Sequence, residues 1–391
     1  MYGGVEMIFY KVFLIALMVF SLNFYNVKAS DSLLSGAKSG LLMEVATGTI
    51  IYEKNIHEKV SVASMTKMMG MILIMESIED GKIRLDEMVK VSKNASGMGG
   101  SQIWLEEGES MSVLDLIKGI MMASANDGIV CMAERIGGSE ENFVKMMNEK
   151  AYELGLKNTN FKNPTGLDEE GHYSTAYDKA LIAKELIKHE EIFKYTSIYE
   201  DYLRKGTDRE YWLVNTNKLI KTYQGADGLK TGMTDNAGYC MAVTAVRDNM
   251  RLLAIVLGEE SGKVRNQETT ELLDYGFNLY EVTTIKKKGE VLGHIEIDKA
   301  NTNPIEIVAS SDVTILKKQS DTDKEYKSDV KLKTLNLPIK KGDEIGTLIV
   351  RDDIGNKIDE VVITVSSDIK KDNFFNILLK FLKSMIQGEL L

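Results

Sequence analysis

Ser64-Met65-Thr66-Lys67 is followed directly by the apolar run Met68-Met69-Gly70-Met71-Ile72-Leu73-Ile74-Met75. We expect a helix here that is buried on most sides, with methionine filling irregular gaps in the core. Residues three apart on a helix share a face, so the Ser64 hydroxyl and the Lys67 amine can meet. A serine hydroxyl is a weak nucleophile without an adjacent base, and lysine can serve when burial or a second cation destabilises its ammonium form.

Strands are predicted on both sides of this helix. Residues 41–45 and 47–52 form two short strands around a turn at Gly48, and strand-like runs return much later in the chain. The later strands cover residues 238–246 and 251–257, and the helical patterns cover residues 113–122, 128–137, 139–154, 175–189 and 263–279. This order predicts an α/β (α+β) domain over residues 30–280, with a sheet that joins both ends of the domain.

After about residue 280 the pattern changes to short, often alternating β-rich runs separated by polar turns. These runs cover residues 305–308, 312–316, 347–350 and 360–365. No helical pattern interrupts them, so we expect a small all-β C-terminal domain over residues 281–367.

The N-terminus predicts export. Lys11 precedes the apolar run 12–20, and Val27-Lys28-Ala29 supplies a small-residue cleavage site. These features define a secretory signal over residues 1–29, cleaved near Ala29. The alternative is a membrane-spanning anchor, but the run is shorter than the roughly 20 residues that a bilayer requires. We therefore expect an extracytoplasmic protein.

The C-terminus predicts an amphipathic helix over residues 372–391. Its apolar side chains fall on one arc of roughly 200°, and lysines, asparagine, serine and glutamine fill the rest. Phenylalanine on one face and lysine on the other suit a helix that lies in a membrane interface. We expect peripheral attachment to the outer face of the cytoplasmic membrane. The alternative is a terminal helix docked on its own protein.

Composition excludes several classes of protein. The 391 residues are 44% apolar and 27% charged, with a net charge of −10, which argues against disorder and against nucleic-acid binding. Cys131 and Cys240 are too few for a disulfide scaffold or a zinc ribbon, and we expect free buried thiols rather than a disulfide. The four histidines, at positions 57, 172, 189 and 294, show no metal-binding spacing, so we expect neither metal nor cofactor.

Two further motifs accompany Ser64-x-x-Lys67. Ser124-Ala125-Asn126 lies sixty residues on, between two predicted helices, and Lys230-Thr231-Gly232 follows about a hundred residues later, at the expected edge of the sheet. Each motif is common by chance. In this order S-x-x-K, S-x-N and K-T-G are far more specific than any one of them.

On these motifs the chain resembles the serine D-alanyl-D-alanine carboxypeptidases, the low-molecular-mass penicillin-binding proteins. The resemblance runs from Asp31 to the C-terminus and includes Asn163-Pro164-Thr165-Gly166-Leu167-Asp168, Ser174-Thr175-Ala176 and Asp227-Gly228-Leu229. It implies a transpeptidase/β-lactamase-like catalytic domain, followed by a β-rich domain and an amphipathic helix. It also implies removal of the terminal D-alanine from peptidoglycan stem pentapeptides, with β-lactam antibiotics as inhibitors.

The resemblance implies three catalytic residues. Ser64 would be the acylated nucleophile and Lys67 its general base. Ser124 would relay the proton towards the departing D-alanine.

Five positions would bind substrate. Asn126 would lie opposite the nucleophile, Lys230 would supply positive field and attract the substrate carboxylate, and Thr231 would bind that carboxylate. Gly232 would let the substrate backbone approach the strand. The backbone N–H of Met233, with that of the nucleophile, would form the oxyanion hole.

Two departures from the family and two alternatives remain. Met233 stands where the family often has His or Tyr, and Thr216 stands where some members have an arginine that assists carboxylate recognition. A β-lactamase is one alternative, but no Glu-x-x-Leu-Asn segment lies between Asn126 and Lys230. A non-catalytic penicillin-binding sensor is the other, and it would need membrane-spanning helices joined to a signalling module.

Overall fold

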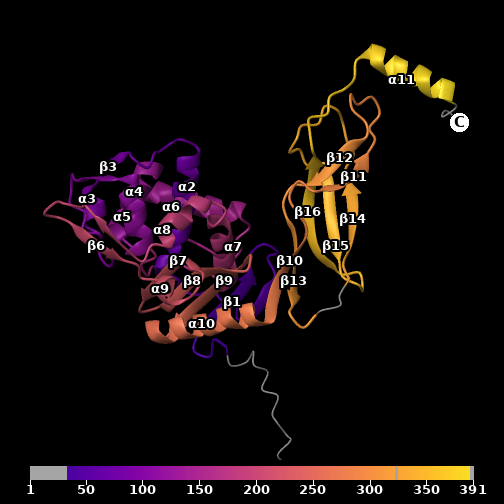
Figure 1. The fold of residues 1–391 in the computed structure, drawn as a ribbon. Helices are drawn as coiled ribbons and strands as arrows, with labels where there is room; N and C mark the ends of the chain where they lie inside the picture. The colour runs from indigo at the N-terminus through magenta and orange to yellow at the C-terminus, as the bar shows by residue number, and fades with distance from the viewer. Residues whose placement is uncertain (1–32, 322–324, 388–391) are drawn as a thin grey trace, which may run out of the picture.

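The computed structural model describes residues 33–321 and 325–387, so the predicted signal at residues 1–29 lies outside the described residues. A mixed α/β domain comes first, an all-β domain follows it, and helix α11 (Phe374–Gln387) stands at the far end (Figure 1). The predicted fold class is confirmed. The central sheet is antiparallel throughout. Its strands, in sheet order, are β2 (Ile50–Lys54), β1 (Ser39–Glu44), β9 (Met250–Glu259), β8 (Gly238–Arg247) and β7 (Ala226–Thr234).

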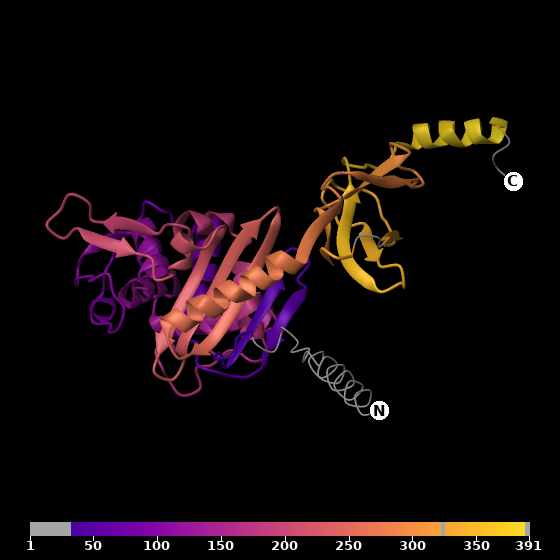
Figure 2. The same cartoon turned by 60° about the horizontal axis from the view of Figure 1, so that its bottom comes forward.

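The sheet joins both ends of the catalytic domain, as predicted, because β1 pairs with β9. Side chains alternate between the two faces of each strand. Leu42 and Leu252 belong to the core beneath α10 (Gly262–Leu279), whereas Leu41 and Leu253 belong to the larger core on the opposite face. Figure 2 shows α10 lying across its face of the sheet.

The remaining helices lie between β2 and β7 in the sequence, and most of them contribute to the larger core. They are α2 (Lys67–Glu79), α3 (Lys93–Ser96), α4 (Val113–Met122), α5 (Asn126–Gly137), α6 (Glu140–Glu153), α7 (Ala176–Leu186), α8 (Phe193–Thr196) and α9 (Leu219–Thr222). Two small antiparallel sheets of two strands each lie among them: β3 (Met88–Lys90) with β4 (Ser110–Ser112), and β5 (Glu200–Leu203) with β6 (Tyr211–Val214). The helix predicted to start at Ser64 begins instead as a 3₁₀ turn, η2 (Ala63–Thr66).

Helix ends follow local capping chemistry. The hydroxyls of Ser112, Ser139 and Thr175 accept the N–H of the third residue after them, at the starts of α4, α6 and α7. Helix α5 ends at Gly138, whose φ of 77° is a left-handed conformation that suits glycine.

The all-β domain is joined to the catalytic domain by a two-stranded ribbon of β10 (Tyr280–Lys286) and β13 (Val313–Lys318). Val282 and Leu316 of this ribbon pack against the core beneath α10, whereas Val313 and Ile315 lie in the core of the all-β domain. The main sheet of that domain contains, in order, β11 (Val291–Ile295), β12 (Ile305–Ala309), β16 (Lys357–Val365), β15 (Gly346–Arg351) and β14 (Lys327–Leu332).

Helix α11 carries exposed apolar side chains, including Phe374 at 80% and Phe375 at 66% exposure. Its 14 residues match the predicted terminal helix. Within residues 33–321 and 325–387, no helix combines the length and the apolar character needed to cross a bilayer.

Candidate active site

The first motif places a serine and a lysine in direct contact. Lys67 Nζ lies 2.8 Å from Ser64 Oγ. In a 3₁₀ turn the residues at i and i+3 eclipse each other, so η2 brings this pair closer than the α-helical spacing used in the prediction. Ala63 enters the turn at φ 47°, which is uncommon for a residue other than glycine. The sequence therefore places the nucleophile candidate on a constrained turn at the head of a buried helix.

The Lys67 amine is fully buried and has three neighbours. It lies 2.6 Å from Asn126 Oδ1 and 2.7 Å from the Thr165 carbonyl oxygen, in addition to Ser64. A neutral amine has two N–H bonds and one lone pair. The two fixed acceptors can take the N–H bonds, which leaves the lone pair directed at Ser64 Oγ. This arrangement suits a base that removes the serine proton.

Burial holds the pKa of Lys67 well below its usual value. The positive charge of Lys230 lowers the pKa further, while the carboxylate of Asp127 opposes the shift. A lysine in this environment can be a neutral base at pH values where an exposed lysine is protonated.

The second motif is only partly assembled around the lysine. Asn126 opens α5, and its Nδ2 donates to the Gly99 carbonyl at 2.7 Å, which fixes the amide orientation. Ser124 sits in the loop before it with φ 64° and is buried. Its hydroxyl makes no hydrogen bond with any residue of the described chain. The structure thus joins Asn126 to Lys67 and leaves the Ser124 hydroxyl unengaged.

The third motif lies on β7, the strand at the edge of the sheet. An edge strand presents free backbone groups to which an extended peptide can pair. A Cβ on Gly232 would lie 3.0 Å from the Val62 carbonyl oxygen and 3.1 Å from the Ser64 nitrogen. We expected a side chain here to obstruct the substrate. The structure adds a nearer reason, because the turn that carries Ser64 packs against Gly232.

Lys230 and Thr231 differ in their surroundings. Lys230 is buried, and its Nζ donates to the Thr231 carbonyl at 2.9 Å. Burial, helped by the charge of Arg265, lowers the pKa of Lys230 to about 7. Its charge is therefore complete only below neutral pH. Thr231 Oγ1 donates to Thr216 Oγ1 at 2.7 Å. Met233, on the same strand, has a side chain that is 55% exposed.

One contributor to the site was not predicted. The Thr165 carbonyl accepts from Lys67, and Asn163 Oδ1 holds its loop by accepting from Thr165 Oγ1 at 2.9 Å and from the Gly166 nitrogen at 2.8 Å. Gly166 has φ 84°, and a Cβ there would lie 2.0 Å from the Ala63 carbonyl oxygen. The resemblance includes the segment Asn163-Pro164-Thr165-Gly166 but implies no role for the Thr165 carbonyl. A turn-forming Pro-Thr-Gly was the available signal.

His172, Cys131 and Cys240 are buried, and their surroundings do not favour a catalytic role. His172 Nε2 lies 2.8 Å from Thr66 Oγ1, and burial lowers the pKa of His172 to about 4, so its ring is neutral. Cys131 and Cys240 are free and buried, which confirms the prediction for these thiols. Burial raises their pKa values to about 12 and about 11, so neither is reactive near neutral pH. The described residues contain no cluster of three or more metal ligands.

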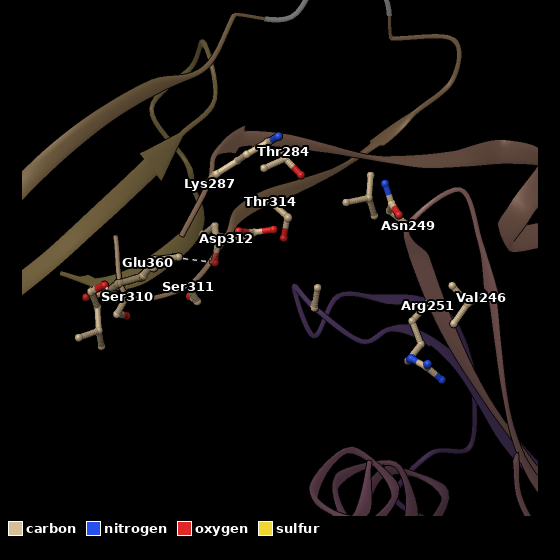
Figure 3. Close-up of a pocket in the computed structure, with 15 residues that line it drawn as sticks. Val246, Asn249, Arg251, Thr284, Lys287, Ser310, Ser311, Asp312, Thr314 and Glu360 are labelled. Atoms are coloured by element: carbon tan, nitrogen blue, oxygen red, sulfur yellow. Dashed lines mark hydrogen bonds between the residues drawn. The ribbon is translucent and has the colours of Figure 1, made fainter. Parts of the chain in front are cut away.

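A cavity of about 1060 Å³ lies between the two domains, away from these motifs (Figure 3). Its lining includes Arg251 from β9 and Lys287, Asp312 and Glu360 from the all-β side. The Arg251 guanidinium is already paired with the Asp227 carboxylate at 2.8 Å. None of the predicted site residues lines this cavity, so the candidate active site is the one at Ser64.

Comparison with known proteins gives one consistent result. Residues 26–261 match the family model for D-alanyl-D-alanine carboxypeptidases, and residues 280–371 match the model for the C-terminal domain of penicillin-binding protein 5. The D-alanyl-D-alanine carboxypeptidase DacF of Bacillus subtilis (strain 168) is 48% identical over 352 residues, which are 90% of this chain and 90% of that protein.

Solved structures agree. Penicillin-binding protein 5 from Haemophilus influenzae has a TM-score of 0.73 and 31% identity, covering 86% of this chain and 98% of that one. Penicillin-binding protein D2 from Listeria monocytogenes, in its ampicillin-bound form, has a TM-score of 0.56 and 32% identity, covering 62% of this chain and 98% of that one.

Proposed function

The chain belongs to the D-alanyl-D-alanine carboxypeptidase family, and we propose that within it Ser64 is the nucleophile and Lys67 the general base. The activity is serine-type hydrolysis of the D-Ala-D-Ala bond, and peptidoglycan stem peptides are the substrate class. One observation carries the assignment. The buried Lys67 amine faces Ser64 Oγ at 2.8 Å while two other acceptors hold its N–H bonds.

Acylation then proceeds in balanced steps. Ser64 Oγ attacks the carbonyl carbon between the two D-alanines as its proton passes to Lys67 Nζ. The C–N bond breaks, the proton held by Lys67 passes through the Ser124 hydroxyl to the departing D-alanine nitrogen, and an ester remains on Ser64. Water hydrolyses this ester and regenerates the serine. The Ser124 hydroxyl forms no hydrogen bond with a described residue, so it is available for this relay.

The substrate lies along the free edge of β7 in this proposal. Backbone N–H groups of Ser64 and Met233 stabilise the oxyanion, and losing one such donor typically costs roughly 10²–10³ in turnover. Gly232 allows the strand to lie against the turn of the nucleophile. Asn126 fixes the base, and Lys230 with Thr231 receives the terminal carboxylate. β-Lactams, which imitate this substrate, acylate the same Ser64.

Export and membrane attachment complete the proposal. Residues 1–29 direct export, with cleavage near Ala29, and α11 attaches the enzyme to the outer face of the cytoplasmic membrane. The exposed Phe374 and Phe375 support an interfacial role for this helix.

The deciding experiment follows D-alanine release from a muropeptide that ends in D-Ala-D-Ala. The wild type should release D-alanine, and Ser64→Ala should release none while keeping its melting temperature. Penicillin binding without D-alanine release would favour a sensor. Rapid penicillin turnover would favour a β-lactamase.

A further inference from the structure

A second hydroxyl lies beside that of Thr231, the residue proposed above to bind the substrate carboxylate. Thr231 Oγ1 donates to Thr216 Oγ1 at 2.7 Å, although the residues are fifteen positions apart. Each hydroxyl has one donor and two acceptor lone pairs. The Thr231 hydroxyl donates its hydrogen to Thr216 Oγ1, and no described residue accepts a hydrogen bond from the Thr216 hydroxyl. The pair therefore keeps one O–H free to donate.

The segment around Thr216 is built to hold this position. Asn215 and Asn217 are each 1% exposed. Asn215 Nδ2 donates to the carbonyls of Thr196 and Ile198, and Asn217 Nδ2 donates to the Gly228 carbonyl on β7. The backbone nitrogen of Thr216 donates to the Met122 carbonyl at the end of α4. Two buried amides and one backbone bond thus fix a half-buried threonine between the helical layer and the edge strand.

No guanidinium reinforces this seat in the described part of the chain, where neither hydroxyl is bonded to an arginine. The adjacent cations are lysines with other partners. Lys230 Nζ donates to the Thr231 carbonyl, and Lys218 Nζ donates to the Asn215 carbonyl at 3.0 Å. An anion arriving at β7 therefore meets hydroxyl donors first.

We propose that Thr216 is a substrate-binding residue that, together with Thr231, forms a two-hydroxyl seat for the terminal carboxylate of the stem peptide. This inference rests on the proposed function, because it assigns a further residue to the same site. The Thr216 O–H donates either to the carboxylate directly or to Thr231, which then donates to the carboxylate. In both arrangements the two hydroxyls polarise each other in the same direction.

If Thr216 binds the carboxylate, its hydroxyl should contribute more to the turnover of peptides with a charged C-terminus than to that of peptides with a neutral one. A hydrogen bond to a charged group contributes more than one to a neutral group. Removing the Thr216 hydroxyl should therefore lower the preference for a free acid without abolishing acylation.

The test compares kcat/KM for an acyl-D-Ala-D-Ala peptide with that for the same peptide ending in D-alaninamide. Thr216→Val should lower the value for the acid by about tenfold or more, and that for the amide by less than about threefold. Thr216→Ser, which keeps the hydroxyl, should stay within about threefold of the wild type for both peptides. Equal losses for acid and amide, or no loss for the acid, would overturn the proposal.

A second measurement separates this proposal from the proposed function. Ser64 acylation by benzylpenicillin, which carries a free carboxylate, is compared with acylation by its methyl ester. If the wild type releases no D-alanine, the carboxypeptidase function fails, while a selective loss with benzylpenicillin in Thr216→Val still supports the carboxylate seat. Equal effects on the acid and its ester would refute the seat even in an active carboxypeptidase.

Discussion

The Lys67 amine lies 2.6 Å from the side-chain oxygen of Asn126, 59 positions further along the chain. Asn126 Nδ2 is itself committed to the Gly99 carbonyl, so the oxygen cannot turn away without losing that bond. The amide therefore acts as a fixed acceptor that directs the lone pair of a neutral Lys67 towards Ser64. The protonation state of Lys67 should consequently govern how activity depends on pH.

Lys230→Met should move the acid limb of the kcat/KM profile to higher pH. The charge of Lys230 helps to lower the pKa of Lys67, so removing it raises that pKa and keeps the base protonated over a wider range. The position of the limb is read from the pH profile independently of any loss in overall rate. Lys145→Met, on the exposed face of α6, is the control. A limb that stays in place or moves to lower pH would contradict this account.

Gly232→Ala should slow acylation at least about tenfold, towards the roughly 10²–10³ lost with an oxyanion donor. The added Cβ would lie 3.0–3.1 Å from atoms of Ala63, Val62 and Ser64, so the nucleophile turn must shift. The rate of Ser64 labelling by penicillin measures this effect. Gly293→Ala, whose nearest contact is 4.0 Å in the all-β domain, should label at the wild-type rate. Normal labelling of Gly232→Ala would show that the turn tolerates the methyl group.

Glu259, which lies against Glu268, should make the catalytic domain less stable as pH rises from about 4.5 to 8. Glu259 is 1% exposed, and among the described residues no group with good hydrogen-bond geometry faces either of its carboxylate oxygens. Burial, and then the hydrogen bond and charge of Glu268, raise the pKa of Glu259 to about 8. The folded state thus binds a proton that the unfolded state releases above pH 4.5, and this stability is lost as pH approaches 8.

Between about pH 4.5 and 8 the free energy of unfolding should fall by up to about 1.4 kcal/mol per pH unit. Urea unfolding at several pH values measures it. Glu259→Gln keeps a donor towards Glu268 and cannot titrate, so it should flatten the slope and be more stable than the wild type at pH 8. An unchanged slope in Glu259→Gln would exclude the pair as its source.

The buried Lys179 should make the free energy of unfolding increase with pH between about 7 and 10, which is opposite to the effect of Glu259. Its amine is fully buried, has no hydrogen-bond partner within residues 33–321 and 325–387, and lies 5.1 Å from the centre of the Phe161 ring. Burial lowers the pKa of Lys179 from 10.5 to about 7. Between these pH values Lys179 is protonated in the unfolded state and neutral in the folded state. The free energy of unfolding therefore decreases as pH falls from about 10 to 7.

Lys179→Met should raise the free energy of unfolding, by most at pH 7 and by least near pH 10. The replacement suits a core already rich in methionine. Lys188→Met, an exposed lysine beyond the end of the same helix, should change little at either pH. A gain that does not depend on pH would mean that packing, and not the buried amine, limits stability.

Deletion of residues 373–391 should release the mature protein from membrane vesicles. Replacing both Phe374 and Phe375 with serine should weaken sedimentation with anionic vesicles, because apolar burial drives interfacial binding. Asn376→Ser is the matched control in the same turn. If the truncated protein sediments as well as the full chain, another surface makes the attachment.

The helices and strands that were predicted from the sequence are those whose hydrophobic pattern extends over many residues. The strand run at 251–257 and the helix at 113–122 are recognisable because alternation or helical periodicity persists over several residues. The two-stranded sheets β3–β4 and β5–β6 were not predicted, because strands of three or four residues are too short to show a period.

The active-site residues were predicted because their side chains form recognisable sequence motifs. The features that were not predicted have no sequence motif. The Thr165 carbonyl is a backbone group that any residue could supply. The start of the helix at Lys67 was missed because a spacing of three fits a 3₁₀ turn as well as an α-helix. The Glu259–Glu268 pair depends on how α10 packs beside the end of β9, which no local pattern encodes.

The ribbon of β10 and β13 has a mechanical consequence. Val282 and Leu316 pack against one core, and Val313 and Ile315 lie in the other, so two hydrogen-bonded strands carry any load between the domains. A single peptide linker would let the catalytic domain swing freely, whereas a paired ribbon resists bending and twisting. With α11 attached to a bilayer as proposed, Ser64 would lie at a nearly constant height above it. The architecture would then select substrate by its depth in the wall as well as by its chemistry.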